Sequence, residues 1–423
     1  MGQTGSSTAR APYLRWGLIW LSALGGACGN ADRRDASQPA PQAIAGCETI
    51  DVAPCDTHEL GCLQSRLELA ACLRDTSPGR LPAISVMTEQ EYADYSNSLY
   101  DGAPLRPNHF EVAMTWLGLA QPGSFAYTRL AGADLADWFG TYRWRQQDLL
   151  LIEHGKPADD DAANVELVAA LILALRDRDT NLARWPTVVS ITDIDSNWGG
   201  DAMYFGEAHF YSNRYKAALE GRSAIDLDEL TRINASIRED IAWIRSQPSS
   251  YVATLDRFPE NFGARLACLA WNRDGAEGVN GLYESKFLTH QLMAAETEQG
   301  EAPPVRLHAQ PIAPDGWVSD PSITAIGAWG LFLSLSRTSS TDEAWPLSLG
   351  WRGDQIYVFK GAPPSEDTAL VWQLEMDSEE SAAALETKLA AGTPDAEIQR
   401  DGTFVTLAIT TADNALDWAF VTD

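Results

Sequence analysis

The chain has 423 residues and a formal net charge of −28 at pH 7, from 31 Lys and Arg residues against 59 Asp and Glu residues. Hydrophobic residues make up 45% and charged residues 21%, which is typical of a globular protein and excludes a disordered chain. A surface this acidic repels phosphate groups, so we expect no nucleic-acid partner. The 15 Trp residues are expected mainly in the core.

The first 27 residues have the features of an export signal. Arg10 and Arg15 precede a short apolar run over Trp16–Leu24, and small residues follow it up to Cys28. The run is shorter than the roughly 20 residues that cross a bilayer. A cysteine after small residues suggests a lipoprotein signal, although the run ends four residues before the cysteine, where three is usual. We expect cleavage after residue 27, acylation of Cys28 and, from Gly29, sorting to the outer membrane.

A polar tether without apolar periodicity is expected over residues 28–46, and a cysteine-rich stretch follows it over residues 47–78. In an exported protein this clustering predicts two disulfides that staple a small helical hairpin, with the pairing left open. A zinc site is disfavoured, because only His58 lies nearby and the spacing is wrong. Cys268 lies in an apolar run and is expected to be a buried free thiol. The four disulfide candidates are Cys47, Cys55, Cys62 and Cys72.

A mostly helical body is predicted over residues 80–343. It begins with a strand over residues 81–87, and Thr88 with Glu91 forms a capping box that opens a helix. Two strand-like runs around a polar turn predict a β-hairpin over residues 142–152. The apolar spacing then predicts helices over about residues 162–176, 201–220, 226–245 and 262–272.

The pattern changes over residues 344–423. Three apolar runs predict strands at residues 355–359, 369–374 and 403–409, with an amphipathic helix over residues 378–389 between the last two. This order predicts a small ββαβ unit packed on the helical body. The fold class is therefore α+β.

Residues 140–182 resemble the active-site region of a family of secreted and lipid-anchored bacterial zinc metallopeptidases with a zincin-like fold. In that family a β-hairpin and a Gly-Pro-acidic turn precede a helix that carries His-Glu-x-x-His and then Ala-Leu-Gln-Asp. Here the turn is Gly155–Asp160 and the helix ends with Ala174–Asp179. The family's second helix carries Glu-Gly-Glu-Ala, where this chain has Phe205–Ala208.

Further similarities follow in the same order along the chain, and the likeness covers about residues 80–420. The shared order carries the resemblance, since each piece is short and common. It implies a mostly helical zincin-like body with a β-hairpin before the active-site helix. The matching segments are Phe258–Arg265, Asp274–Tyr283, Gly327–Trp329 and Trp351–Asp354.

The resemblance implies a zinc site made by two His residues and a carboxylate, with a Glu as general base. In this chain Ala169 and Leu173 stand at the two His positions, and Ala170 stands at the base position. Phe205 stands at the carboxylate position of the second helix, where only the neighbouring Glu207 remains. Methyl groups cannot bind zinc, and alanine cannot take a proton from water. We therefore expect a degenerate active site, with no catalytic residue, metal or other cofactor.

This departure favours a non-catalytic pseudo-metallopeptidase at the cell envelope that binds a protein or peptide partner in the old substrate cleft. One alternative is a hydrolase with an atypical metal site built from Glu207, His209 and nearby carboxylates such as Glu166. Residues two apart on a helix do not share a face, which favours a surface carboxylate and a partly buried histidine instead. A second alternative is a cell-wall or glycan-binding lipoprotein that uses exposed tryptophans such as Trp185 or Trp198.

Overall fold

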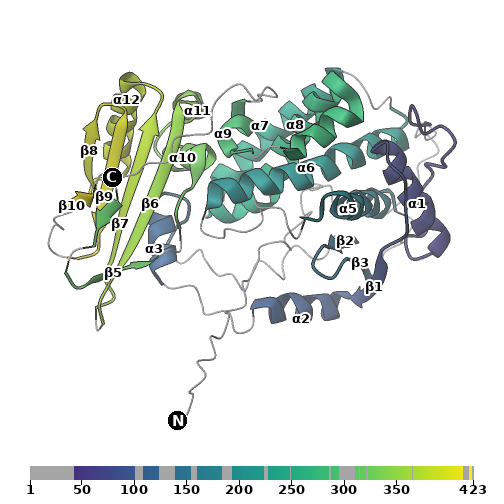
Figure 1. Cartoon of the computed structure of the whole chain (residues 1–423), viewed down its shortest axis with the longest axis horizontal. Coiled ribbons are helices and arrows are strands. Elements are labelled where there is room, and N and C mark those ends of the chain that lie inside the picture. The colour runs from purple at the N-terminus through teal and green to yellow at the C-terminus, as the bar shows by residue number, and fades with distance from the viewer. Residues whose placement is uncertain are drawn as a thin grey trace, which may run out of the picture.

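The structure is a computed structural model, and it confirms the α+β class (Figure 1). Long helices form one part of the molecule, and a five-stranded sheet forms the other. The structure describes residues 42–100, 108–122, 139–153, 160–182, 193–222, 227–247, 249–284, 287–294, 310–313, 315–320, 323–363, 365–412 and 419–421. The signal, Cys28 and most of the tether lie outside these ranges.

The helical body is built from four long helices that lie side by side (Figure 1). The first of them is mostly apolar and is buried along most of its length, and its few polar side chains there, such as Glu166 and Arg176, are buried with it. Asp160 accepts a hydrogen bond from the Ala162 amide as its N-cap. The body also contains the short 3₁₀ helix η4 (Leu282–Glu284) and α9 (Thr289–Ala294). The four long helices are α5 (Asp161–Thr180), α6 (Ile194–Leu219), α7 (Leu227–Ser246) and α8 (Ser250–Gly281).

Two glycines, Gly206 on α6 and Gly263 on α8, let the backbones of these helices come into contact where the helices cross. A Cβ atom added at Gly206 would lie 2.2 Å from the Cα atom of Gly263, which is closer than real Cβ contacts. The same atom added at Gly263 would lie 1.8 Å from the carbonyl oxygen of Ala202. The helices can therefore pack this closely only because these positions carry no side chain.

The cysteine-rich stretch contains one helix, α1 (Leu60–Leu73), so the predicted helical hairpin is wrong. The residues before α1 form turns and coil that the disulfides fasten to the helix. The disulfides themselves are confirmed, with pairing Cys47–Cys72 and Cys55–Cys62. Cys268 is a buried free thiol, as predicted.

A three-stranded sheet of order β1-β3-β2 packs beside α5. Its strands β2 (Gly140–Arg143) and β3 (Asp148–Glu153) form the predicted β-hairpin, and β1 (Ala83–Thr88) runs parallel to β3. Helix α2 (Glu89–Tyr100) follows β1 directly, and α3 (Asn108–Trp116) contacts the C-terminal sheet instead. The hairpin thus leads the chain into α5, as the sequence predicted.

The C-terminal unit is a five-stranded antiparallel sheet of order β5-β6-β7-β9-β8. It begins earlier than the predicted residue 344, because β5 (Trp317–Asp320) is its first strand and precedes α10 (Gly327–Leu335) and α11 (Thr341–Leu349). The predicted ββαβ order also lacked a strand, since α12 (Glu379–Gly392) is followed by two strands. The remaining strands are β6 (Trp351–Gly361), β7 (Thr368–Met376), β8 (Glu397–Asp401) and β9 (Phe404–Thr410), with a separate ribbon of β4 (Gln310–Ile312) and β10 (Ala419–Val421).

A partly buried carboxylate on β6, Asp354, fixes the start of α10. Asp354 accepts hydrogen bonds from the backbone amides of Ile326 and Gly327, both at 3.0 Å. It also accepts from the indole groups of Trp351 at 3.2 Å and Trp372 at 3.0 Å. The sheet therefore holds the N-terminus of α10, where amide groups have no partner within the helix.

A second carboxylate, the buried Asp195 in the first turn of α6, lies at the same junction. It accepts hydrogen bonds from the backbone amide and the hydroxyl of Thr289, at 3.0 and 2.5 Å. The Thr289 hydroxyl in turn accepts from the amide of Trp329 in α10. One hydrophobic core runs through this junction, from Leu171 in the body to Leu370 on the sheet. The two parts are therefore packed as one unit.

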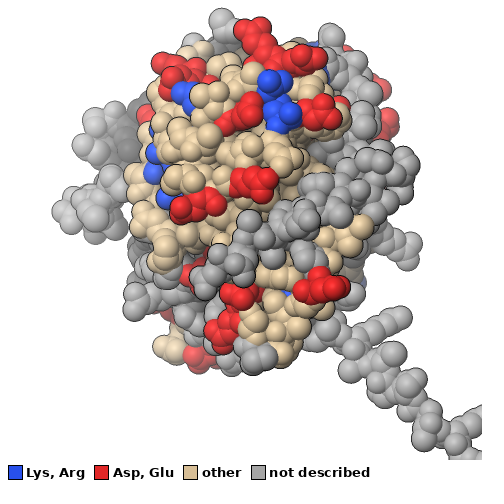
Figure 2. All heavy atoms as spheres, turned by 90° about the vertical axis from the view of Figure 1, so that its left-hand side faces the viewer, with Lys and Arg blue, Asp and Glu red and all other residues tan. Residues whose placement is uncertain are grey.

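The outer surface carries the acidic character that the composition predicts. Figure 2 shows the side of the molecule that carries the C-terminal sheet, where red carboxylate groups are scattered over a neutral surface and blue groups lie in its upper half. None of the helices in the described part of the chain is long and apolar enough to cross a membrane. The two disulfides are typical of an exported protein.

Candidate functional site

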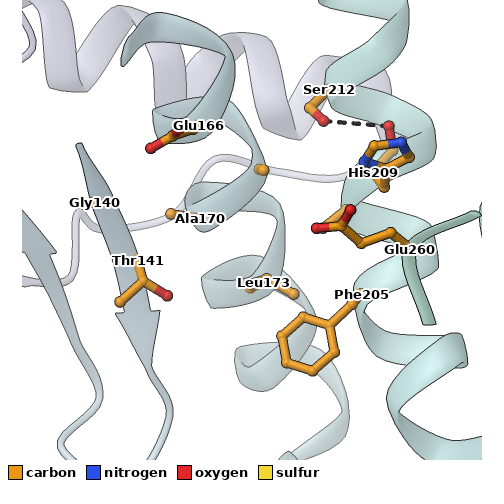
Figure 3. Close-up of a pocket in the computed structure, with 11 residues that line it drawn as sticks. Gly140, Thr141, Glu166, Ala170, Leu173, Phe205, His209, Ser212 and Glu260 are labelled. Carbon is orange, nitrogen blue, oxygen red and sulfur yellow. Dashed lines mark hydrogen bonds between the residues drawn. The ribbon is translucent and has the colours of Figure 1, made fainter. Parts of the chain in front are cut away.

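The four positions that the resemblance aligns with the zinc ligands and the base lie together around one small cavity. Ala169, Ala170 and Leu173 face it from α5, and Phe205 faces it from α6 (Figure 3). All four are buried, with exposed fractions of 2% to 8%. The cavity has a volume of about 20 Å³, which is room for about one water molecule. Side chains from two helices thus meet where the resemblance implies a metal.

Polar side chains from α5, α6 and two further elements, β2 and α8, also line the cavity. Thr141 lies on β2, Glu166 on α5 one turn before Ala170, and His209 and Ser212 on α6 (Figure 3). Glu260 reaches in from α8. Both carboxylate side chains are buried, Glu166 with 2% and Glu260 with 3% of its surface exposed.

The imidazole of His209 is neutral at physiological pH. Burial and, to a smaller extent, the charge of Lys216 two turns along α6 together lower its pKa to about 4. The Ser212 hydroxyl donates its hydrogen bond to the backbone carbonyl of His209 and not to the imidazole ring. Glu166 accepts a hydrogen bond from the Phe139 amide at 2.8 Å, which ties the carboxylate to the residue before β2.

The described residues contain no group of three or more His, Cys, Asp or Glu side chains that could hold a metal ion. Two alanines, a leucine and a phenylalanine occupy the ligand and base positions and offer no lone pair. The residues present at the cavity therefore do not fit the zinc that the resemblance implies. The lining of the cavity combines these apolar side chains with the carboxyl groups of Glu166 and Glu260.

Glu207 does not face this cavity, and the interpretation of it as a surface carboxylate is wrong. Its side chain is 1% exposed and receives two hydrogen bonds from Arg176, both at 2.7 Å. Arg74 donates to it at 2.9 Å, and the Tyr283 hydroxyl donates at 2.6 Å. Burial opposes ionisation, yet the two guanidinium groups lower the pKa of Glu207 to about 2. A carboxylate held in this way is neither a free ligand nor a base, and the structure does not bring it together with His209.

A larger groove of about 520 Å³ opens from the cavity. The cavity and the groove share Glu166, Ala169, His209, Ser212 and Glu260, so the groove is continuous with the cavity at these residues. A volume of this size is in the range of natural ligand sites.

Charged groups of both signs line the groove. Arg257 and Asp240 form an ion pair across α8 and α7 at 2.8 Å, and Asn261 donates its amide to the same carboxylate. Apart from Glu166 and Glu260, which the groove shares with the cavity, the other charged groups in its lining come from α6, α7 and the turn after α6. They are Lys216, Glu220, Arg222, Arg232 and Glu239.

The tryptophans proposed for glycan binding are not placed for it. Trp198 is 1% exposed and packs against Tyr251 and Phe258 in the core, which contradicts its use as a surface platform. Trp185 lies outside the described residues.

The sequence pointed to the cavity but missed Glu260 in its lining, and it missed the partners of Glu207. Glu260 lies in the Phe-Pro-Glu-Asn stretch that resembles the family, and its position beside a helical proline gave no sign of a buried carboxylate. Arg74 and Tyr283 lie 133 and 76 residues from Glu207, so no local pattern could pair them with it. An arginine inside a nearly all-apolar helix, Arg176, was the available signal that a buried acid lies opposite.

Comparison with known proteins bears on the C-terminal unit. A family model described as a domain of unknown function (DUF8575) matches residues 317–416. This range starts at β5 and ends shortly after β9, so it coincides with the five-stranded sheet and its helices. No curated protein and no solved structure matches the chain. The match covers less than half of the chain, and the helical body that carries the cavity lies before it.

Proposed function

We propose that the chain is a pseudo-metallopeptidase: a zincin-like body that has kept its substrate groove, has lost its catalytic groups and binds a peptide segment of a partner protein. The meeting of Ala169, Ala170, Leu173 and Phe205 around one cavity supports this proposal best. Packing apolar side chains at that place removes the chemistry but keeps the helix pair together. The groove above the cavity offers the space and the polar groups that a peptide needs.

The proposed location is the bacterial cell envelope, with a lipid on Cys28 and the body carried on the tether. This part rests on the N-terminal sequence, and the two disulfides agree with export. Metabolic labelling with a radioactive fatty acid tests it. We expect label on the protein and none on a Cys28→Ser variant, and an unlabelled parent protein would remove the lipid anchor from the proposal.

Peptide binding is tested with the full-length protein purified in detergent and an immobilised hexapeptide library. Ser236 lies on α7 in the lining of the groove, so Ser236→Trp should obstruct it. Ser246 ends the same helix outside that lining, which makes Ser246→Trp the matched control. We expect peptide capture that Ser236→Trp weakens at least tenfold and Ser246→Trp leaves unchanged. Capture that both variants keep, or cleavage of the peptides, would contradict the proposal.

A further inference from the structure

We propose that a second cavity, between the helical body and the C-terminal unit, binds a small oxyanion: a phosphate or a carboxylate group. The cavity has a volume of about 90 Å³. It lies where the segment after α3 and the ends of α7 and α10 meet the start of α8. No described residue lines both this cavity and the groove, so the inference does not depend on peptide binding in the groove.

Two arginines give this cavity a positive charge. Arg245 near the end of α7 and Arg337 just after α10 both line it, and its described lining contains no Asp or Glu. A guanidinium group stays charged at every physiological pH. Both side chains are exposed, so an ion from solution can reach them. In a chain with 59 acidic residues against 31 basic ones, this lining reverses the overall charge locally.

The hydrogen bonds of the two arginines hold them in place without neutralising them. Arg245 donates to the backbone carbonyls of Ser336 at 3.0 Å and Ser339 at 3.2 Å, and to the hydroxyl of Thr341. These bonds cap the C-terminal end of α10, which is a structural role in itself. Arg337 donates to a backbone carbonyl in the last turn of α3 at 3.3 Å. All four acceptors are uncharged, so an anion in the cavity would supply the counter-charge.

A buried hydroxyl in the same lining has a hydrogen bond to give. Ser336 is 8% exposed, and its hydroxyl makes no hydrogen bond with any described residue. Leaving a buried polar group without a partner costs free energy, which an anion beside the two guanidinium groups would recover by accepting this bond. The lining also includes Ser250, the first residue of α8, and a helix N-terminus adds partial positive charge.

A glycine makes the room that Arg337 needs. Gly118 has a φ of +78°, and a Cβ atom there would lie 2.7 Å from the Cδ atom of Arg337. The arginine side chain can therefore lie against the backbone after α3 only because this position carries no side chain. The forked N–H donors of arginine match the oxygen atoms of phosphate and carboxylate groups. A volume of about 90 Å³ has room for a group larger than one water molecule.

The test is calorimetric titration of the full-length protein in detergent with sodium phosphate and with sodium acetate. Sodium chloride keeps the ionic strength constant, so that any heat reports a preference over chloride. Arg337→Gln removes one charge from the cavity. Arg400→Gln is the matched control, because Arg400 is an exposed arginine on β8 that pairs with Glu386 and does not line the cavity.

We expect at least one of the two anions to bind with a stoichiometry of one per chain, and the anion that binds distinguishes a phosphate site from a carboxylate site. Arg337→Gln should weaken this binding about tenfold, because it removes charge-assisted hydrogen bonds, and Arg400→Gln should leave it unchanged. Ser336→Ala should also weaken binding. In the absence of the anion it should not lower the unfolding temperature, since the hydroxyl bonds to no described residue.

Two results would overturn the inference. If neither anion shows saturable binding, the arginines serve only to fasten the helix ends. If an anion binds but Arg337→Gln binds it as tightly as the parent protein, the ion lies elsewhere. Should Arg337→Gln fail to fold, as judged by thermal unfolding, Ser336→Ala decides the matter, and unchanged binding in that variant would reject the site.

Discussion

At the scale of single residues, Glu207 has a structural role. Glu207 joins α6 to Arg74 after α1, to Arg176 on α5 and to Tyr283 in η4. Arg74 also pairs with Asp179 at 3.0 Å, which extends the network to the end of α5. These charges are buried and mutually hydrogen-bonded, so each depends on the others being present.

Replacing Glu207 by glutamine should therefore be strongly destabilising. The change leaves two guanidinium groups buried with one counter-charge fewer, and we expect a loss of about 3–5 kcal/mol in the free energy of unfolding. Chemical denaturation measures this loss. Glu220→Gln, which breaks the exposed ion pair with Arg222 at the end of the same helix, should lose no more than about 1 kcal/mol. Equal losses in both variants would show that the buried network does not stabilise the fold.

Two acids at the junction between the body and the sheet, Asp195 and Asp354, should make the folded protein less stable as the pH rises. Burial raises the pKa of Asp195 to about 7 and that of Asp354 to about 6, and their mutual repulsion adds to the first shift. The folded protein therefore holds protons that the unfolded chain releases near pH 4. Stability should fall as the pH rises from about 4 to about 7 and stay level above that range.

An Asp195→Asn variant tests this dependence. Asparagine keeps an oxygen that accepts from Thr289 but has no proton to lose, so the decline between pH 4 and 7 should become shallower. Melting temperatures across that range measure the slope. A slope identical to that of the parent protein would place the titrating group elsewhere. Glu207, whose pKa is lowered to about 2, adds a separate loss only on the acid side of about pH 4.

At the scale of elements, the cavity depends on how closely α6 and α8 approach. Gly206→Ala puts a methyl group into the backbone of Gly263, and we expect a loss of at least about 3 kcal/mol, because no side chain at the contact can move away. Gly281→Ala, at the end of α8 where nothing lies within 4 Å, is the control and should change stability by less than about 0.5 kcal/mol. Thermal unfolding separates the two, and a mild Gly206→Ala would mean that the helices can shift apart.

Local patterns predicted the elements whose environment is uniform along their length. Apolar side chains in the sequence were enough to predict α5, the hairpin before it, and the strands β6, β7 and β9. The pattern failed where structure depends on distant partners. Strand β5 has four residues and gains its stability from pairing with β6, and the coil before α1 is held by disulfides instead of by a second helix.

The candidate site was predictable in part for the same reason. The order of motif-like segments placed Ala169, Ala170, Leu173 and Phe205 at one site, and the structure brings these four side chains together. Glu260 comes from another segment of the chain, and only tertiary packing brings it to the cavity; the same holds for Arg74 beside Glu207. Sequence reasoning therefore found the positions that changed and missed the groups that surround them.

At the scale of the whole molecule, the helical body with its groove and the C-terminal sheet form one packed scaffold. The junction carboxylates and one continuous core hold the sheet against the body, so the groove is presented by a single packed unit. The central claim is that the cavity between α5 and α6 stands where a zinc ion would be bound. Restoring the ligands tests this claim directly.

The measurement is the visible absorption spectrum during titration with Co²⁺ of a variant that combines Ala169→His, Leu173→His and Phe205→Glu. Two histidines four residues apart on α5 and a carboxylate on α6 would then face one cavity, which is a ligand set for a tetrahedral site. We predict an intense tetrahedral Co²⁺ spectrum that saturates at one ion per chain, displaced by zinc, and no such spectrum for the unaltered protein. A variant that keeps the parent's circular dichroism but binds no cobalt, or a parent protein that binds it, would contradict the account.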